Sequence, residues 1–190
     1  MRRNTTPTQP QTSSTPGRKP THMDSNRLEV STVVYVPPSE AYDFLIDFPR
    51  YAEYSEYLAA VTQHGDGQVD TEYDLKLSWW KFAYTTRSRV TGIEAPERID
   101  WEIIKTIDAA GSWIIEPVGE DLGSRVRMAV EFDLDSLSDA EELPDLPFAS
   151  LAEKAKPKLL AEAEAVVERI VADLEGEPRE VELQIHESPI

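Results

Sequence analysis

The strongest constraint on the fold of this chain is an alternation of apolar and polar residues that recurs through its middle. Between Val69 and Leu77 every second residue is apolar or Thr, and the residues between them are Asp, Glu or Lys. A period of two recurs over residues 82–90, 99–107 and 126–134. Successive side chains of a β-strand point to opposite faces of a sheet, so this pattern predicts antiparallel strands with one apolar and one solvated face.

Turn residues separate these segments. The stretch from Leu28 to Val36 is rich in β-branched residues and stops at two prolines, which predicts a first strand. The sequence Gly65-Asp66-Gly67 predicts a turn before the next strand. Gly111 is interpreted as a break between the third of the alternating segments and the strand that carries Trp113.

Helical spacing occurs on both sides of the predicted strands. Pro38 suits the first position of a helix, and apolar residues follow at helical intervals up to Phe48, so we expect a short helix that Pro49 ends. A further helical turn with inward aromatic side chains is predicted from Tyr51, Tyr54, Tyr57 and Leu58. Residues 151–174 predict a long final helix that Gly176 ends. Pro157 is expected to kink this helix or to mark its true start.

The two ends of the chain differ in composition from the rest. Residues 1–22 are rich in Thr, Pro, Gln and Ser and carry four basic residues and no acidic one, so we interpret them as a disordered basic tail or leader. Residues 176–190 are rich in Glu, and we expect an acidic C-terminal tail that is loose or forms a short edge strand. The folded domain is therefore expected to span residues 28–175.

The charge of the chain limits its partners. Its 36 acidic and 19 basic residues give a net charge of −17. Binding to nucleic acid requires clustered Lys and Arg, so the sequence argues against a nucleic-acid partner and against anionic membranes. Acidic residues are spread over the predicted strands and helices rather than packed in one tail, and Lys is scarce beside them, which is typical of a halophilic protein. We expect a haloarchaeal origin.

Several kinds of chemistry are excluded by the residue types present. The chain has no Cys, which excludes disulfides, thiol nucleophiles and cysteine-bound metals. The three histidines, His22, His64 and His186, are far apart in sequence, so we predict no metal site, no cofactor and no His-based catalytic relay. No apolar run approaches the roughly 20 residues of a membrane-spanning helix, so we expect a cytoplasmic protein without stable membrane insertion.

Two short motifs resemble those of a known superfamily. Residues 38–51 read Pro-Ser-Glu-Ala-Tyr-Asp-Phe-Leu-Ile-Asp-Phe-Pro-Arg-Tyr, and later come Gly111-Ser112-Trp113 and Glu116-Pro117. The first resembles the helix and Asp-x-x-x-Tyr entry of the coenzyme Q-binding branch of the START-like (SRPBCC) superfamily, which also contains polyketide cyclase/dehydrase-like proteins. The second resembles the strand of that branch with an inward Trp. The resemblance covers about Leu28 to Leu174 and implies an α+β helix-grip fold, in which a strongly bent antiparallel sheet wraps around a long C-terminal helix.

The resemblance also implies an apolar cavity between sheet and helix. The predicted ligand-binding residues that line it are Tyr73, Leu75, Phe82, Tyr84, Thr86, Ser88, Trp101, Trp113, Met128, Val130 and Phe132 from the sheet, and Leu159, Ala163, Val166 and Val167 from the helix. Tyrosine hydroxyls, Thr86 and Ser88 are candidates to orient the polar end of a ligand. The alternation places Arg87, Arg89, Glu102 and Glu116 on the outer face, which leaves no catalytic residue to name.

These expectations favour non-catalytic binding or carriage of a small hydrophobic ligand, such as an isoprenoid quinone, a lipid or a polyketide-like molecule. By resemblance, a menaquinone would suit an archaeal halophile. The alternatives are a polyketide-type cyclase or dehydratase on the same fold, for which Glu102 or Glu116 would have to face inward, and a protein-interaction module similar to ribosome-association toxins. The pair Trp79-Trp80 lies between two predicted strands and is a candidate to close the pocket mouth, to form a homodimer contact or to touch a membrane interface.

Overall fold

The strands of the protein form one curved sheet. The computed structural model describes residues 26–79, 82–105, 107–119, 123–133, 136 and 148–189, and among these it describes no side chain for 26, 79, 82, 148–160 and 187–189. The basic segment 1–22 and Trp80 lie outside the described residues. The eight strands are β1 (Asn26–Val34), β2 (Leu58–His64), β3 (Glu72–Trp79), β4 (Phe82–Glu94), β5 (Arg98–Lys105), β6 (Asp108–Pro117), β7 (Ser124–Asp133) and β8 (Gln184–Pro189).

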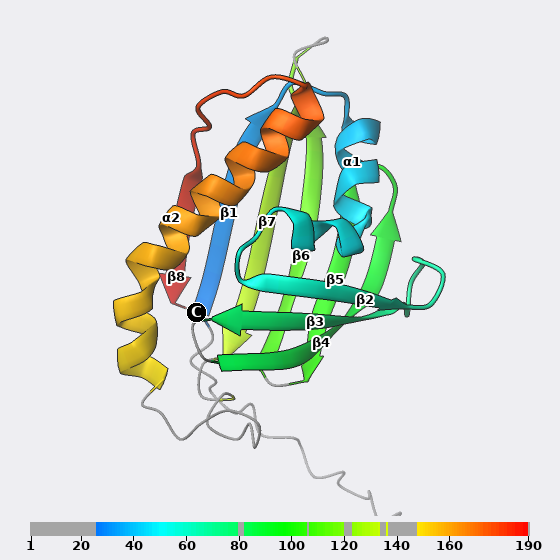
Figure 1. The fold of residues 1–190 in the computed structure, drawn as a ribbon. Coiled ribbons are helices and arrows are strands. Elements are labelled where there is room, and N and C mark those ends of the chain that lie inside the picture. Colours follow the sequence, from blue (N-terminus) through cyan, green and yellow to red (C-terminus); the bar gives the residue numbers. More distant parts are fainter. Residues whose placement is uncertain are drawn as a thin grey trace, which may run out of the picture.

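The order of the strands is β2-β3-β4-β5-β6-β7-β1-β8, and every neighbouring pair is antiparallel. The sheet bends strongly: β2, β3 and β4 cross the lower part of the view in Figure 1, whereas β1, β6 and β7 run upright. The long helix α2 (Phe148–Glu175) crosses the concave side of the sheet. This arrangement is the α+β helix-grip fold that the sequence predicted.

Two short helical elements cover another part of the concave side. Helix α1 (Pro38–Ile46) begins at the predicted proline and contacts β6 and β7. The 3₁₀ helix η1 (Phe48–Glu53) follows after a single residue and includes Pro49, because proline is tolerated in the first turn of a helix. The predicted second helical turn therefore exists, but it ends at Glu53. Its proposed last member, Leu58, instead begins β2.

Helix α2 differs from the prediction at its start. It begins at Phe148, nine residues before Pro157, so this proline does not mark the start of the helix. The helix ends as predicted: Gly176 has a φ of 77°, a left-handed conformation that is unfavourable for residues with a side chain.

Gly111 does not break a strand, which corrects the expectation from the sequence. Strand β6 runs through it without interruption, and Gly111 lies opposite Trp101 of β5. A Cβ atom at position 111 would lie 2.5 Å from Cζ2 of Trp101 and 2.8 Å from the carbonyl oxygen of Ala129. Glycine is therefore needed here to make room for the indole ring, and the two strands are separated earlier, since β5 ends at Lys105 and β6 begins at Asp108.

The C-terminal segment contains an edge strand. Strand β8 pairs with β1, with Ile185 opposite Val30. The preceding residues are tied to the same strand, because the Arg179 guanidinium donates to the carbonyl oxygen of Val33 at 2.7 Å and to Glu175 at 2.8 Å. Of the two possibilities that the sequence left open for this segment, the described part forms the short strand.

The core lies between α1, η1, the C-terminal half of α2 and the sheet. Its fully buried side chains come from separate elements and include Ala41 and Phe44 of α1, Val171 of α2, and Tyr73, Val90, Ile99 and Ile115 of the sheet. Burial of such side chains stabilises a fold by about 1.5–3 kcal/mol each. This core therefore fixes the position of the helices over the concave side of the sheet.

Candidate functional site

The pairing of the strands places the predicted sheet residues on one face. Directly opposite residues of antiparallel strands share a face, and Tyr73 lies opposite Ser88 while Leu75 lies opposite Thr86. The same relation continues from Val90 to Trp101 and from Trp113 to Met128. The predicted residues on this face are Tyr73, Leu75, Tyr84, Thr86, Ser88, Trp101, Trp113, Met128, Val130 and Phe132. We call this the concave face.

The remaining predicted residues are less uniform. The side chains of Phe82 and Leu159 lie outside the described residues, as does that of Trp79. On α2, Val166 and Val167 pack against the core. Ala163 is exposed, so the described packing of the helix on the core does not include it.

Burial is uneven along the concave face. Tyr73, near the turn between β2 and β3, is only 1% exposed. Several other inward side chains remain partly exposed although they are apolar or aromatic. This group consists of Tyr84, Trp101, Met128, Val130 and Phe132. The described chain therefore leaves part of its inward apolar surface incompletely covered, and apolar surface of this kind favours binding of an apolar molecule.

An aromatic group contributed by η1 was missing from the predicted site. The rings of Phe48 and Tyr73 pack edge to face with their centroids 4.9 Å apart, and Tyr51 contacts Trp113 at 6.4 Å. The signal for these residues was the Asp47-x-x-x-Tyr51 motif together with the inward aromatic spacing. Neither signal indicated which strands the rings would meet, since β3 and β6 are not neighbours in the sheet.

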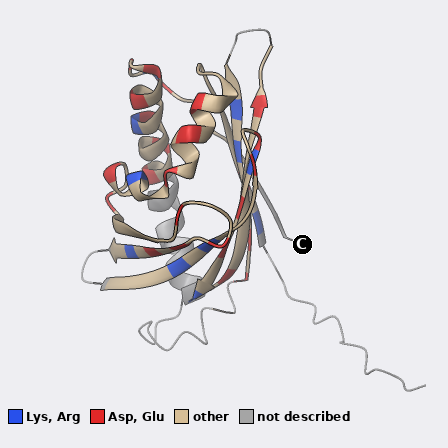
Figure 2. Ribbon diagram, turned by 90° about the vertical axis from the view of Figure 1, so that its right-hand side faces the viewer, with Lys and Arg blue, Asp and Glu red and all other residues tan. Residues whose placement is uncertain are grey.

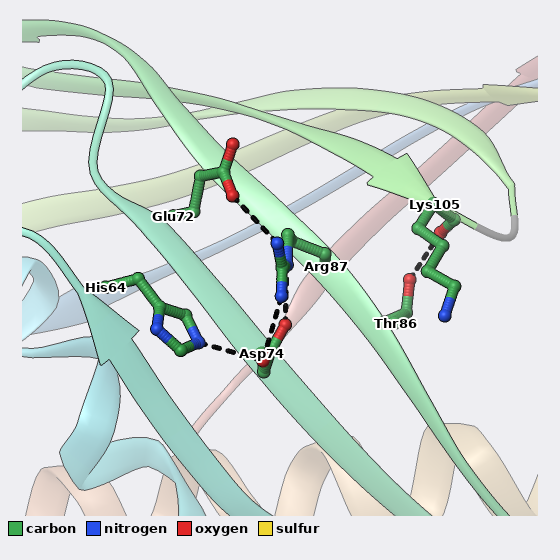
Figure 3. Close-up of polar contacts among 6 residues, drawn as sticks. All are labelled: His64, Glu72, Asp74, Thr86, Arg87 and Lys105. Atoms are coloured by element: carbon green, nitrogen blue, oxygen red, sulfur yellow. Dashed lines mark hydrogen bonds and ion pairs between the residues drawn. The ribbon is translucent and has the colours of Figure 1, made fainter.

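Two hydroxyl groups near the concave face have partners within the chain. The Tyr51 hydroxyl donates to the carbonyl oxygen of Leu45 at 2.6 Å, and the Thr86 hydroxyl donates to the carbonyl oxygen of Lys105 at 2.5 Å (Figure 3). Burial raises the pKa of Tyr51 well above 10, and the charge of Asp47 raises it further. The Tyr51 hydroxyl therefore stays protonated at neutral pH and acts as a hydrogen-bond donor.

Two other polar groups on this face are buried without a partner. They are the hydroxyl of Tyr73 and the indole Nε1 of Trp101. Burial raises the pKa of Tyr73, and the charges of Asp47 and Asp66 add to the effect. The Tyr73 phenol is therefore neutral at pH 7, and each of the two groups keeps a hydrogen-bond donor that has no acceptor within the chain.

The opposite face of the sheet is charged. Arg89 donates to Glu102 at 2.5 Å, and Arg87 binds Asp74 through Nε at 2.6 Å and Nη2 at 3.1 Å. Glu116 lies opposite Arg125 and next to the buried Ile115, so it points to this outer face as well. The outward orientation expected for Arg87, Arg89, Glu102 and Glu116 agrees with this register.

A small polar network forms around Asp74 on the outer face (Figure 3). His64 Nε2 lies 2.8 Å from one carboxylate oxygen of Asp74, and Arg87 also reaches Glu72 at 3.1 Å. The hydrogen bonds from Arg87 and His64 lower the pKa of Asp74 from 3.8 to about 2. These side chains are partly exposed, so the network resembles a surface ion-pair cluster, which contributes little stability per pair.

Charged contacts also connect α2 to η1 at the border of the concave face. The Tyr54 hydroxyl donates to Asp173 at 2.6 Å, and Arg50 forms an ion pair with the same carboxylate. Arg169 donates to the carbonyl oxygen of Tyr54. Burial and the hydrogen bond with Asp173 raise the pKa of Tyr54 to about 12. These contacts hold α2 against η1 and against Tyr54, the buried residue that follows it.

Two features are absent from the part of the chain that the structure describes. Among the described residues, no group of three or more His, Asp or Glu is placed to hold a metal ion. No helix in this part of the chain combines the length and apolar character needed to cross a membrane.

Comparison with solved structures identifies the fold. The di-domain aromatase/cyclase StfQ of the steffimycin biosynthetic pathway is similar over 80% of this chain, with a TM-score of 0.59 and 16% identity, and this chain spans only 51% of StfQ. TTHA0849 of Thermus thermophilus is similar over 79% of this chain and 97% of its own, with a TM-score of 0.57 and 15% identity. Norcoclaurine synthase of Thalictrum flavum is similar over 82% and 99%, with a TM-score of 0.55 and 13% identity. At these identities the likeness shows a shared fold.

Sequence comparison identifies the family. No curated protein sequence matches the chain significantly. A family model described as "Polyketide cyclase / dehydrase and lipid transport" matches residues 25–175, which include all strands from β1 to β7 and the whole of α2. This agrees with the resemblance to START-like proteins that the motifs indicated. The chain therefore belongs to the polyketide cyclase/dehydrase and lipid transport family.

Proposed function

We propose that this protein binds and carries a small hydrophobic molecule on the concave face of its sheet, without chemically changing it. The observation that carries this proposal is the distribution of charge across the sheet. From β3 to β7 the charged side chains alternate with the residues of the concave face and so lie on the outer face. Lys105 at the end of β5 does not follow this alternation, because it lies opposite Arg87, where the register between β4 and β5 shifts.

The composition of the concave face supports binding more than catalysis. A general base or acid must lie within hydrogen-bond reach of its substrate and have a pKa suited to proton transfer. Glu102 and Glu116, the carboxylates that would have indicated a cyclase, point to the outer face and lie beside Arg89 and Arg125. What remains on the concave face is an apolar and aromatic surface with neutral polar groups, which is typical of a ligand pocket.

An isoprenoid quinone is our first candidate for the ligand. Its flat ring would lie against aromatic side chains such as Trp101 and Trp113, and its apolar tail would cover the partly exposed Met128 and Val130. A lipid or a polyketide-like molecule would use the same apolar surface. The family to which the chain belongs includes lipid transport in its description, which is compatible with each of these ligands.

Ligand binding is tested on the full-length protein purified without detergent. Native mass spectrometry should show a bound mass that is lost on denaturation, and titration with a short-chain menaquinone should quench Trp fluorescence in a saturable manner. The test variant is Val130→Asp, which places a charge on the concave face, and its matched control is Ala129→Asp, which places the same charge at the neighbouring outward position. Binding should be lost in the first variant only. Equal quenching in both variants, with no bound mass, would contradict the proposal.

A cyclase or dehydratase on the same fold is the second candidate function. It is favoured by one observation, the Tyr73 hydroxyl without a partner, because a neutral phenol can donate a proton to a carbonyl oxygen. In such an enzyme Tyr73 would act as general acid. A turnover assay with a poly-β-ketone substrate distinguishes the two functions, since a carrier returns the ligand unchanged.

A further inference from the structure

Two buried hydrogen-bond donors on the concave face lack acceptors. Tyr73 is 1% exposed, and its hydroxyl has no hydrogen-bond partner. The Nε1 atom of Trp101 is also buried and also has no hydrogen-bond partner. A buried polar group without a partner costs about 1–3 kcal/mol. Folding does not by itself explain why these two groups are placed here, because the phenyl ring of a Phe would fill the space of Tyr73 without this cost.

The positions of the two donors link them to the same surface. Tyr73 lies opposite Ser88 on β4, and Val90, the next inward residue of β4, lies opposite Trp101 on β5. The two side chains are therefore separated by one strand on one face of the sheet. Neighbouring strands lie about 4.8 Å apart, so β3 and β5 are about 10 Å apart, a distance that a bicyclic molecule with a hydrogen bond of about 3 Å at each end can span.

Two other hydroxyl groups near this face are already engaged within the chain. The Tyr51 hydroxyl donates to Leu45 and the Thr86 hydroxyl donates to Lys105, so each already has a backbone acceptor. A Trp indole is a donor only, and it cannot serve as the acceptor for Tyr73 through Nε1. The missing partner of Trp101 must therefore be an acceptor atom.

The charge around the site limits what carries that acceptor. The segment of residues 38–53, which holds α1 and η1, bears four acidic residues against Arg50 alone. Helix α2 bears six acidic residues against Lys154, Lys156, Lys158 and Arg169, and five of the six acidic residues lie in residues 161–175. Figure 2 shows Asp and Glu residues on α1 and on the coloured part of α2. This excess of acidic residues, together with the net charge of −17 of the chain, disfavours an anionic ligand. The charged residues of β3–β7 that alternate with the concave face lie on the outer face.

From these observations we infer that the ligand is an uncharged hydrophobic molecule with a carbonyl-type oxygen, and that Tyr73 and Trp101 donate hydrogen bonds to its oxygen atoms. This inference rests on the proposed function and adds the polar chemistry of the ligand to it. Hydrocarbon lipids lack the acceptor, and fatty acids carry the wrong charge. Quinones and other ketones satisfy both conditions.

Three bicyclic probes of similar size separate these cases: menadione with two carbonyl groups, methylnaphthalene with none, and naphthoate with a negative charge. Isothermal titration calorimetry at pH 7 should show that menadione binds at least about tenfold more tightly than either of the others, since one hydrogen bond is worth about this factor. Menadione cannot alkylate a thiol of this protein, because the chain has no cysteine.

The variants assign the preference to the two donors. Tyr73→Phe should reduce the ratio of menadione to methylnaphthalene affinity by about tenfold and leave methylnaphthalene binding unchanged. Trp101→Phe should reduce the same ratio. Any loss of apolar contact in this variant weakens the binding of both probes, so it cancels in the ratio of their affinities. Tyr35→Phe removes a hydroxyl from a residue that is 65% exposed, so it should leave the ratio unchanged.

Each outcome decides a different point. If none of the three probes binds, the proposed carrier function fails together with this inference. If methylnaphthalene binds as tightly as menadione, or if Tyr73→Phe retains the full preference for menadione, the carrier function stands and the assignment of the donors is wrong. If naphthoate binds most tightly, the conclusion that the ligand is uncharged is wrong.

Discussion

The indole ring of Trp101 lies directly against Gly111, the residue opposite it on β6. This contact allows a large aromatic side chain to lie flat across the neighbouring strand and to remain on the concave face. It also explains why a glycine occurs in the middle of a strand, where glycine is otherwise unfavourable.

Replacement of Gly111 by Ala should destabilise the protein. The new methyl group would lie 2.5 Å from Trp101 and 2.8 Å from the backbone of Ala129, so either the ring or the strand must move. Overpacking of this kind costs about 1–3 kcal/mol. Urea denaturation should show this loss together with a shift in Trp fluorescence. At Gly92 the nearest atom to an added methyl is the end of the Asp100 side chain at 3.0 Å, so Gly92→Ala should cost less. Equal losses in the two variants would contradict this explanation.

Two tyrosines of the core should respond in opposite ways to loss of the hydroxyl. Tyr51→Phe removes a hydrogen bond to Leu45 and should lower the free energy of unfolding by about 1 kcal/mol. Tyr73→Phe removes a buried hydroxyl without a partner and should leave the free energy of unfolding unchanged or raise it by up to about 1 kcal/mol. Urea denaturation of the ligand-free protein measures both. A similar loss in both variants would indicate that the Tyr73 hydroxyl has an acceptor.

The contact between Tyr54 and Asp173 should couple η1 to α2. Loss of the 2.6 Å hydrogen bond in Tyr54→Phe is expected to cost about 1 kcal/mol, and Asp173→Asn should cost a similar amount because it also weakens the pair with Arg50. A double-mutant cycle should give a coupling free energy of at least about 0.5 kcal/mol. Additive effects would show that the two residues do not interact in solution.

Acid should remove the stability that Asp74 contributes. Its pKa is lowered in the folded protein from 3.8 to about 2 by Arg87 and His64, so the carboxylate stabilises the fold above about pH 4 and loses this effect as the pH falls toward 2. The difference in urea midpoint between wild type and Asp74→Asn should be present at pH 6 and shrink over this range. High salt should reduce the difference at pH 6, since the pair is partly exposed. A difference that is the same at pH 2.5 and pH 6 would exclude this role.

Much of the candidate site was predictable from local pattern. The alternation around Tyr73 and Leu75 is a property of the strand backbone itself, so the residues that share a face with them could be predicted without knowing the strand partners. The turn at Gly65 and Gly67 was also predictable from local sequence, because both residues adopt a positive φ that favours glycine.

Other features depended on contacts between residues distant in the chain. The sequence could not indicate that Gly111 accommodates Trp101, because this requires knowledge of which residues lie opposite each other. The same holds for β8, whose pairing with β1 joins the two ends of the folded chain. The interpretation of Gly111 as a strand break was wrong because glycine has two uses in strands, and only its neighbours distinguish them.

The sequence by itself determined which side chains share the apolar face and which charges share the opposite one, because side-chain alternation is fixed by the backbone of each strand. Only the tertiary structure decided that the Tyr51 and Thr86 hydroxyls have backbone acceptors while Tyr73 and Trp101 do not. Hydrogen-bond partners are set by distances of about 3 Å between residues far apart in the chain, and such distances follow from packing alone.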